Sequence, residues 1–453
     1  MLEGRWNMKF LLVNLDWPGL VSKKTYKIHL SLPPLDLLLM SNFVNEKGDE
    51  AIIFDGFVED PSRLQGLLTW ADWIVVATTP YHMWQCPNSE WNWITKALEQ
   101  FPKEKVILSG LHASIFPEQS LKSTGVHAVI RREPEGVLRD FLAKRRWEDT
   151  QGVSFLREGQ LVENPLGALP LMDELVVKNY NVDISRYGYL LLGDKTGVFE
   201  ASRGCPWKCT FCDQEMYSWK YRTKTPQVFA QEVSNGIEQS GMKNAYFYDL
   251  EFTVSKKRTL ELCEELIKQK VQDKLRWTCQ TRADTVNEEV VEAMKAAGCV
   301  LIHFGVESAN PEALRGTNKK IDLESIDKGV RLVKKLGLQT ACFFMFGLPG
   351  EKPDEFDNTL EFARNLNPTY ASFHFAIPFP GTPLYDQYIQ EKKLPWGVWP
   401  ATFFEGWPHE QIVHYLSRAY KKFYLWPKKI EPRQFLFRLQ NLPRKLSYFS
   451  SVV

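Results

Sequence analysis

The sequence predicts an α/β protein with two parallel sheets in succession, a doubly wound sheet and then a partial (β/α)6 TIM-type barrel, followed by a short helical C-terminal region. Two observations predict the sheets. Short apolar segments alternate with helical patterns up to about residue 131, and again from 197 to 375. Such alternation is typical of parallel strands joined by crossover helices. A third observation separates the two series: a loop with three cysteines follows the first strand of the second series.

The composition is ordinary for a globular protein. A chain of 453 residues, 44% hydrophobic and 25% charged, can bury two or three cores. Lys and Arg total 56 against 55 Asp and Glu, so the net charge of +1 gives no general attraction to nucleic acid. No signal peptide and no run of eighteen apolar residues is evident, so we expect a cytoplasmic protein with reduced or metal-bound cysteines.

The first series, residues 1–145, predicts the doubly wound sheet. Its strands are expected at Lys9–Leu15, Ala51–Asp55, Trp73–Ala77, Lys105–Gly110 and Ala128–Arg131. A helix is expected after Pro33, because proline is tolerated in a first helical turn. Ligands of such sheets dock at the carboxyl ends of the strands. A domain of this kind that binds no ligand is equally compatible with the pattern. Residues 146–195 show little periodicity and several turn signals, which predicts an ordered connector.

The second series, residues 196–395, predicts the barrel. Its strands are expected at Gly197–Ser202, Asn244–Tyr248, Arg276–Gln280, Leu301–Val306, Gln339–Met345 and Ala371–Phe375. Six strand–helix units fall short of the usual eight. We therefore expect a lateral gap through which a large substrate or a second domain reaches the interior.

The cysteine loop carries the strongest chemical signal. Cys205, Cys209 and Cys212 have the spacing C-x3-C-x2-C. Thiolates are soft ligands suited to iron–sulfur clusters, and three of them would leave the fourth iron of a 4Fe–4S cluster without a protein ligand. Structural zinc would need a further Cys or His near by, and a disulfide would leave one thiol unpaired. Buried structural thiols are the remaining alternative.

This loop, with Phe211 before its last cysteine, resembles the motif of the radical SAM superfamily. The resemblance implies a 4Fe–4S cluster whose open iron binds the amino and carboxylate groups of S-adenosylmethionine (SAM). It also implies cleavage of SAM to a 5′-deoxyadenosyl radical and an electron donor such as flavodoxin or ferredoxin.

The ends of the later strands fit the same resemblance. They carry Asp249 and Glu251 for the SAM ammonium, Arg282 for its carboxylate, Glu307 and Ser308 for ribose, and Gly347 for adenine. The pattern that these residues resemble has a second Asp where this chain has Leu250. The sequence therefore leaves open whether Asp249 or Glu251 contacts the ammonium. Each residue taken singly is also compatible with a helix cap or a turn.

Three segments of the first series resemble landmarks of cobalamin-binding domains fused to radical SAM enzymes. They are Pro33–Leu37, Ser109–Ser114 and Arg132–Gly136, which depart from the usual P-P-L-G-L, G-G-x-H-A-T and G-E-G-E at Asp36, Leu111 and Pro134. The resemblance implies cobalamin contacts from Pro33, Gly110, His112 and Glu133. No D-x-H-x-x-G occurs, so cobalamin is expected without a lower-face histidine, and His82 and His112 are expected to be packed or surface residues. A domain that only walls the active site is the alternative.

The C-terminal region, residues 396–453, is aromatic and basic, with nine Lys or Arg against two Glu between 409 and 453. We favour a capping helix that closes the open end of the barrel. The other interpretation is peripheral contact with an anionic membrane.

The resemblance as a whole implies a cobalamin-dependent (class B) radical SAM enzyme. Methyl transfer to an unactivated carbon of a small-molecule or lipid-like substrate is the favoured reaction. A cobalamin-dependent cyclase of the tetrapyrrole type, or a non-catalytic cobalamin or redox sensor, are the alternatives.

Overall fold

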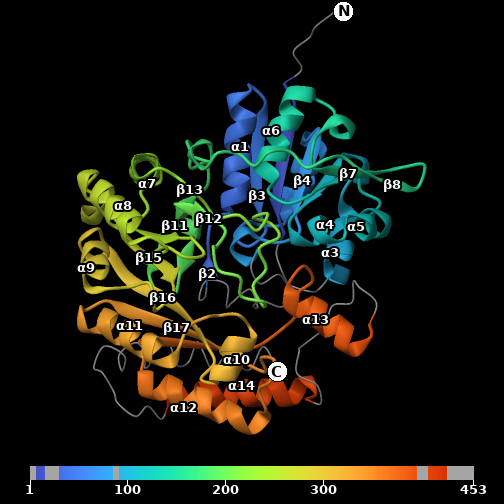
Figure 1. The fold of residues 1–453 in the computed structure, drawn as a ribbon. Helices are drawn as coiled ribbons and strands as arrows, with labels where there is room; N and C mark the ends of the chain where they lie inside the picture. The colour runs from blue at the N-terminus through green and yellow to red at the C-terminus, as the bar shows by residue number, and fades with distance from the viewer. Residues whose placement is uncertain (1–6, 16–29, 85–90, 395–406, 426–453) are drawn as a thin grey trace, which may run out of the picture.

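The first sheet has seven strands in the order β3–β1–β4–β5–β6–β7–β8 (Figure 1). The computed structural model describes residues 7–15, 30–84, 91–394 and 407–425. The strands are β1 Lys9–Asn14, β3 Glu50–Asp55, β4 Trp73–Ala77, β5 Val106–Ser109, β6 Ala128–Ile130, β7 Val153–Arg157 and β8 Gln160–Glu163. The helices are α1 Leu35–Glu46, α2 Ser62–Trp70, α3 Trp91–Ala97, α4 Leu111–Ile115, α5 Pro117–Thr124 and α6 Pro134–Lys144.

Both faces of this sheet are covered, as predicted for a doubly wound domain. Phe10 and Leu12 of β1 pack in one cluster with residues of α1 and α6. Leu11 and Val13 point to the other face, where α2, α3 and α5 supply the packing. Because successive side chains alternate between two buried faces, the strands are continuous apolar runs.

The edge of this sheet differs from the prediction. The segment predicted as part of the connector forms the antiparallel hairpin β7–β8, and β7 pairs with β6. The turn consists of Glu158 and Gly159, both with positive φ (52° and 79°). Such a two-residue turn suits the twist of a hairpin. A short hairpin beside unpatterned chain is a weak sequence signal, and it was missed.

The second sheet confirms the predicted partial barrel of six parallel strands. Their order is β11–β14–β15–β16–β17–β18, which is the order of the chain. The strands are β11 Thr196–Phe199, β14 Asn244–Phe247, β15 Arg276–Thr281, β16 Cys299–Glu307, β17 Gln339–Phe346 and β18 Tyr370–Phe375. The crossover helices are α7 Pro226–Ser240, α8 Lys256–Lys268, α9 Glu288–Ala296, α11 Leu323–Lys335 and α12 Phe356–Leu366, with the shorter α10 Pro311–Gly316 and α13 Pro383–Lys392 after β16 and β18. Side chains of Ser255, Asn287 and Asp322 cap three of these helices, which fixes where each begins.

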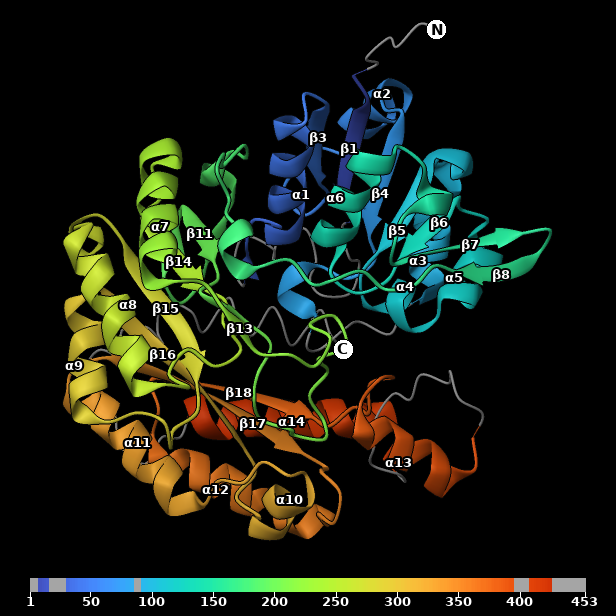
Figure 2. The ribbon, with the colours of Figure 1, turned by 45° about the horizontal axis from the view of Figure 1, so that its top comes forward.

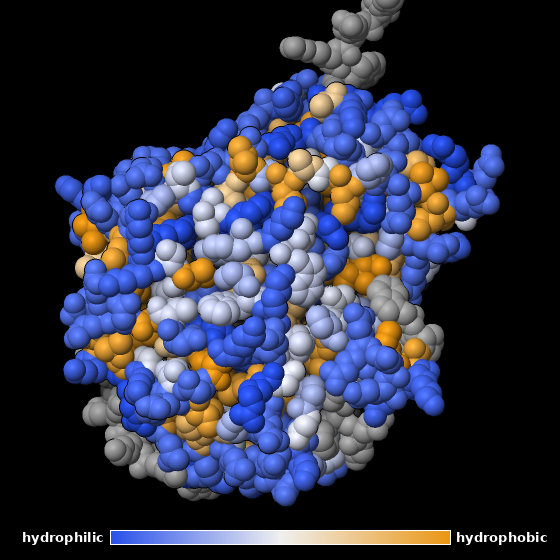
Figure 3. Space-filling view, viewed as in Figure 1, coloured by the Kyte–Doolittle hydropathy of each residue, from blue (hydrophilic) through white to orange (hydrophobic). Residues whose placement is uncertain are grey.

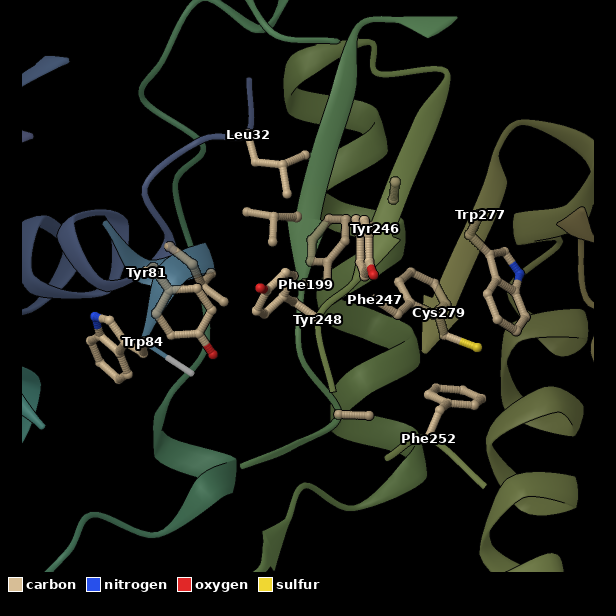
Figure 4. Packing of buried hydrophobic residues seen from close by; sticks show 14 of the residues in the cluster. Leu32, Tyr81, Trp84, Phe199, Tyr246, Phe247, Tyr248, Phe252, Trp277 and Cys279 are labelled. Carbon is tan, nitrogen blue, oxygen red and sulfur yellow. The ribbon is translucent and has the colours of Figure 1, made fainter. Parts of the chain in front are cut away.

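The two sheets share one hydrophobic core. Residues of both belong to a single buried cluster. Tyr81, which follows β4, lies beside Tyr248, just after β14, with ring centres 5.6 Å apart (Figure 4), and Trp84 packs on Tyr81 with ring centres 4.7 Å apart. Figure 2 shows the first sheet and the barrel side by side, with the loop between β12 (Ser202–Arg203) and β13 (Arg222–Thr223) between them. The first domain therefore covers one side of the open barrel.

Helix α14 (His409–Tyr424) packs along the free edge of β18, the last strand of the barrel. The hydroxyl of Tyr424 accepts a hydrogen bond from the Ala371 N–H and donates one to the Ala371 carbonyl, both at 2.9 Å. The Tyr420 hydroxyl accepts from the Phe373 N–H at 3.1 Å. An unpaired edge strand is a site of aggregation, and here two tyrosines occupy its backbone groups.

This arrangement supports the capping interpretation for the described part of the C-terminal region. Residues 396–406 and 426–453, with most of its aromatic and basic side chains, lie outside the described residues. No helix within the described ranges is long and apolar enough to cross a membrane. Hydrophilic residues cover most of the face seen in Figure 3, and hydrophobic residues form scattered patches on it.

Tyr424→Phe should destabilise the barrel edge. The substitution leaves the buried N–H and carbonyl of Ala371 without a partner, which costs about 1–3 kcal/mol. Hydrogen exchange followed by mass spectrometry should show faster exchange in β18. Tyr415→Phe is the control, because the Tyr415 hydroxyl bonds to Asp357 and to no strand backbone group. Equal protection of β18 in both variants would contradict the capping role.

Candidate active site

The cysteine loop runs from β12 to β13, which pair antiparallel at its base. Gly204, directly before the first cysteine, has φ +74°, and a Cβ there would lie 2.1 Å from the Lys220 carbonyl oxygen. Only glycine permits both this backbone conformation and the close approach. The chain after the cysteines is thus packed against the chain just before them.

Contacts from distant parts of the chain hold the loop in shape. The N–H of Thr210 donates to the Thr317 carbonyl at 2.9 Å, and the Thr210 carbonyl accepts from the Leu384 N–H at 2.9 Å. The Asn318 side chain donates to the Lys208 carbonyl at 2.7 Å. Residues far away in the sequence therefore contribute to the conformation of the loop.

All three cysteines line one cavity of about 420 Å³. Its other lining residues come from the cysteine loop, from the barrel strands and the segments that follow them, and, in the first domain, from His82. They include Trp207, Phe211, Tyr248, Leu250, Glu251, Gln280, Arg282, Glu307, Lys319, Phe343, Phe344, Met345, His374, Phe375 and Phe379. Burial raises the pKa of the Cys205 thiol to about 12 and also raises that of Cys209. These thiols therefore need a bound cation in order to ionise at neutral pH.

Glu251 is the carboxylate at the end of the second barrel strand that reaches this cavity. It is 1% exposed, and burial raises its pKa to about 7. Its Oε1 atom accepts from the hydroxyls of Thr281, Thr285 (3.0 Å) and Thr253 (3.3 Å). Because all three bonds go to one oxygen, Oε2 is the atom left for a ligand.

Asp249, the other predicted carboxylate, is not among the residues that line the cavity. It is fully buried and accepts from the Ala201 N–H at 3.0 Å and from the Ser202 hydroxyl. The side chain points to the strand that leads into the cysteine loop. Asp249 therefore supports that loop and does not face a ligand. Of the two predicted carboxylates, the structure favours Glu251 as the one that contacts a ligand.

Arg282 lines the cavity, but other residues occupy most of its donors. Its Nε and Nη2 atoms donate to Asp284 at 2.9 and 2.6 Å, and its remaining bonds go to the carbonyls of Lys319 (2.6 Å) and Lys320 (2.9 Å). The guanidinium also lies 4.1 Å from the centre of the Trp207 ring. Of its five N–H groups, four are used.

Glu307 and Lys319 form a buried ion pair on the cavity wall. Their Oε1 and Nζ atoms are 2.8 Å apart. Burial alone would lower the pKa of Lys319, but Glu307 and the Cys209 thiol raise it above its ordinary value. Lys319 thus stays charged beside the cysteines. It has three N–H donors, and this pair uses one.

Two further predicted residues lie outside the cavity lining. The Ser308 hydroxyl donates to Glu351, and Glu351 in turn accepts from the Leu348 N–H at 3.1 Å. Gly347, at φ +73°, belongs to the turn that this carboxylate holds. Ser308 and Gly347 therefore shape the turn after β17, and the predicted direct contacts of Ser308 with ribose are not supported.

Arg203, next to Gly204, is the centre of a buried ion cluster between the two domains. Its guanidinium contacts Glu133 (2.9 Å) and Glu135 (2.6 Å) of the first domain and Glu200 (2.8 Å) at the end of β11. All four side chains are at most 1% exposed. Glu133 also pairs with Arg222. Glu133, predicted as a cobalamin contact, is thus committed to two arginines.

Asp36 lies close to this cluster, in the first turn of α1. It is 2% exposed, and burial, followed by the nearby Glu135 charge, raises its pKa to about 8. Its Oδ1 atom has no hydrogen-bond partner among the described residues. With three carboxylates already facing two guanidinium groups, a fourth negative charge would be uncompensated. Asp36 is therefore neutral at pH 7.

The remaining cobalamin landmarks lie at the carboxyl edge of the first sheet. Gly110 has φ +105°, and a Cβ there would be 2.8 Å from the Thr79 nitrogen. His112 is stacked on Trp91 with ring centres 3.7 Å apart, and burial lowers its pKa to about 3. Pro33 is buried just before α1. His112 is thus a packed histidine, as predicted.

Two buried polar atoms at this edge lack partners among the described residues. They are Asn14 Oδ1 at the end of β1 and Ser109 Oγ at the end of β5. The sheet order changes direction between β1 and β4, and ligands of such sheets bind at that switch point. His82 follows β4 and lines the cavity of the cysteines. This edge therefore offers unsatisfied hydrogen-bonding groups to a ligand rich in amides. The corrin of cobalamin is such a ligand.

Comparison with known proteins identifies the family. The model of the radical SAM superfamily matches residues 199–363. An uncharacterized methyltransferase of Pyrococcus horikoshii is 30% identical over 437 residues, which cover 93% of this chain and 94% of the relative. The chain belongs to the radical SAM superfamily. It is also 27% identical over 305 residues to an anaerobic magnesium-protoporphyrin IX monomethyl ester cyclase of Cereibacter sphaeroides, covering 64% of this chain and 49% of the cyclase.

The fold of this radical SAM enzyme has a solved counterpart. The radical S-adenosylmethionine methyltransferase TsrM of Kitasatospora setae, solved with cobalamin and a [4Fe-4S] cluster, superposes with a TM-score of 0.70 at 18% identity, covering 85% of this chain and 75% of TsrM. The likeness confirms the predicted fold, a doubly wound domain before a partial barrel.

Lys319 and His374 are among the cavity residues that were not predicted from the sequence as site residues. Lys319 lies in a loop with no recognisable motif, between two residues with positive φ, Asn318 and Lys320. His374 faces the cavity from β18, where its Nε2 atom is 2.8 Å from the Ser372 hydroxyl. The alternation of β18 places Ser372 and His374 on one face, which is the only signal in the sequence.

The buried Asp36 predicts an unusual pH dependence of stability. Its pKa rises from 3.8 to about 8 on folding, so the folded state binds a proton that the unfolded state releases. Its contribution is most favourable below pH 3.8 and is lost as the pH rises towards about 8. The free energy of unfolding of Asp36→Asn, relative to that of the wild type, should therefore increase by at most about 1.4 kcal/mol for each pH unit up to that pH. Above it, the difference should stay constant. Thermal unfolding of both proteins from about pH 6 to about pH 9 measures this. A difference that is constant with pH would contradict a neutral Asp36.

Proposed function

We propose that this chain is a cobalamin-dependent radical SAM methyltransferase that acts on an unactivated carbon of a small, largely apolar molecule. The observation that carries the proposal is the single cavity lined by the three cysteines, by residues at the carboxyl ends of the barrel strands and by His82 of the first domain. Two cofactors held by the two domains would face one substrate there. The methyltransferase relative over nearly the full chain supports this reaction.

Cys205, Cys209 and Cys212 would hold the cluster, which supplies the electron that cleaves SAM to a 5′-deoxyadenosyl radical. Phe211 packs with Ala313 and Leu348 beside the loop and limits water at that side of the cavity. The bonds of the loop to Thr317 and Leu384 help to orient the three thiols. The protein thus contributes a site that is organised by contacts outside the loop.

The amino-acid end of SAM fits the charged groups next to the cysteines. Glu251 Oε2 is suited to accept from the ammonium. For the carboxylate, Lys319 has two N–H donors left and Arg282 has one, so we propose Lys319 as its main partner. Arg282 would orient the loop that contains Lys319 through its bonds to the carbonyls of Lys319 and Lys320. Glu307 would keep the Lys319 ammonium in place.

Cobalamin fits the carboxyl edge of the first sheet, where Asn14 and Ser109 offer buried atoms without partners. When bound, it supplies the methyl group. Pro33, Gly110 and His112 would shape this edge, and Glu133 would act through Arg203. The proposed cobalamin binding needs no histidine on the lower face.

The substrate end of the cavity is mainly aromatic and apolar, with Phe343, Phe344, Phe375 and Phe379 among its lining residues. A pocket of this composition with few polar groups suits an apolar substrate, including a lipid-like one, that one or two hydrogen bonds orient. His374 is the polar group on that wall.

The seven cysteines of the described residues are free thiols, which supports work in a reducing compartment such as the cytoplasm.

The proposal is tested with protein produced under a cobalamin supply and reconstituted anaerobically with iron and sulfide. About one corrin per chain should co-purify in the base-off form. With SAM and dithionite, the protein should form both 5′-deoxyadenosine and S-adenosylhomocysteine, the product that methyl donation leaves. Cys209→Ala should lose the brown chromophore and 5′-deoxyadenosine formation. Absence of corrin with an intact cluster would overturn the methyltransferase proposal.

The similarity to the cyclase supports a second candidate, radical cyclisation with cobalamin. The two reactions differ in their products. A cyclase would form 5′-deoxyadenosine without S-adenosylhomocysteine, so the ratio of these two compounds separates them.

The proposed role of Lys319 predicts a selective loss of SAM affinity. Lys319→Met should weaken SAM binding by about ten- to a hundredfold, the equivalent of a charge-assisted hydrogen bond of about 1.5–3 kcal/mol. Lys319→Arg should restore most of it. Isothermal titration of the reconstituted protein with SAM measures the affinity, and iron content checks the cluster. If Arg282→Ala weakens SAM binding more than Lys319→Met does, Arg282 is the carboxylate ligand predicted from the sequence.

A further inference from the structure

His374 is the most exposed side chain of the cavity that the cysteines line. Among the described residues of this lining, it alone is exposed, whereas Glu251, Arg282, Glu307 and Lys319 are buried. The alternation of β18 directs its side chain to the interior of the barrel, on the face opposite to that of its buried neighbours. The imidazole is therefore open to a molecule in the cavity.

A row of hydrogen bonds connects this imidazole to the free edge of β18. The Tyr420 hydroxyl accepts from the Phe373 N–H at 3.1 Å and lies 3.2 Å from the Ser372 hydroxyl. The Ser372 hydroxyl lies 2.8 Å from the Nε2 atom of His374. Tyr420 belongs to α14, which lies along β18 (Figure 2). The ring of His374 is thus held by its own strand and by the capping helix.

The Phe373 N–H sets the direction of this row, because a backbone N–H can only donate. Tyr420 then donates to Ser372, and Ser372 donates to His374 Nε2. In this direction both hydroxyls accept one bond and donate one, and the bonds of such a row strengthen one another. The Nε2 atom is therefore an acceptor, and the other ring nitrogen carries any remaining proton.

The imidazole is neutral and has one N–H. His374 lies deep in the molecule, and this burial lowers its pKa, while the nearby Glu307 charge has a smaller opposite effect. Since Nε2 accepts from Ser372, the single proton of the neutral ring is on Nδ1. No residue in the described ranges bonds to Nδ1. The cavity therefore meets an uncharged hydrogen-bond donor at this wall.

Apolar side chains surround this donor. On the neighbouring strand β17, Phe343 and Met345 are in register with Ser372 and His374, and both line the cavity. A polar group of a ligand placed among such side chains loses its water, so its free energy depends on whether it meets the donor. A single polar group in an apolar wall is a typical determinant of ligand orientation.

The charges of the cavity favour an uncharged ligand group at His374. The cations among the described lining residues are Arg282 and Lys319, which are paired with Asp284 at 2.6 Å and Glu307 at 2.8 Å. Their remaining donors suit SAM. A carboxylate beside the neutral imidazole would be a buried charge without a counter-ion, which is costly.

We propose that His374 determines substrate specificity by donating a hydrogen bond from Nδ1 to an uncharged acceptor oxygen, such as a carbonyl, of an otherwise apolar substrate. Ser372 and Tyr420 are positioning residues that keep the proton on Nδ1. The inference rests on the proposed function, because it concerns the substrate end of the same cavity.

The first test compares two compounds of the same shape, acetylnaphthalene and isopropenylnaphthalene, in which a CH2 group replaces the carbonyl oxygen. Equilibrium dialysis with the reconstituted full-length enzyme, SAM and no reductant gives the two affinities. In His374→Phe the ratio that favours the ketone should fall by about two- to tenfold, the equivalent of one neutral hydrogen bond. The ratio is used because it cancels general effects of the substitution on the cavity.

The positioning residues predict the same loss through the tautomer. Ser372→Ala should lower the ratio, and Ser372→Thr, which keeps the hydroxyl, should restore it. Nitrogen NMR of the enzyme labelled with 15N-histidine should show the His374 proton on Nδ1 in the wild type and on Nε2 in Ser372→Ala. The signal of His374 is the one that His374→Phe lacks. Tyr415→Phe is the control on α14, because its hydroxyl bonds to Asp357 and not to this row.

An unchanged ratio in His374→Phe, or a wild-type ring with its proton on Nε2, would overturn the proposal. An equal fall in Tyr415→Phe would also overturn it, because the effect would then come from α14 as a whole. So would a wild type that binds neither compound. Neither measurement involves SAM cleavage, so an enzyme that gives both expected results but forms no 5′-deoxyadenosine would contradict the proposed function and not the role of His374.

Discussion

The buried guanidinium of Arg203 is the interaction on which the arrangement of the two domains depends. It joins Glu133 and Glu135 of the first domain to Glu200 of the barrel, and it directly precedes the cysteine loop. Removing one partner of a buried ion pair leaves an uncompensated charge and costs about 3–5 kcal/mol. The domain contact and the base of the loop are therefore one structure, and the neutral Asp36 beside them keeps the charges near balance.

The open barrel explains why this contact is needed. Six strands leave a gap, and the chain closes it in two ways: the first domain packs on one side, and the hydroxyls of Tyr420 and Tyr424 occupy the free backbone groups of β18 on the other. The cavity that remains is lined by the three cysteines and by many aromatic side chains. Its walls come from the cysteine loop and the barrel, with His82 from the first domain.

Local patterns predicted most of the fold, and long-range pairing limited the prediction of the site. Buried strands such as β1 and β4 are continuous apolar runs, and the cysteine spacing is itself local. Which polar residue after a strand faces the cavity depends on side-chain direction, so Glu251 and Asp249 were indistinguishable. The pairing of Glu133 with Arg203, seventy residues later in the chain, leaves no local pattern, because such a contact exists only after the sheets pack. Lys319 had no motif to mark it.

The contacts of the cysteine loop also make its shape depend on distant parts of the sequence. The loop is held by Glu133 on one side of the sequence and, through Thr210, by the backbone of Leu384 on the other. In a zinc finger the metal drives folding. Here the partners of the loop span about 250 residues of the chain, so both domains contribute to the orientation of the three thiols. A cluster in this loop would therefore depend on the fold of both domains and not on a short metal-binding segment alone.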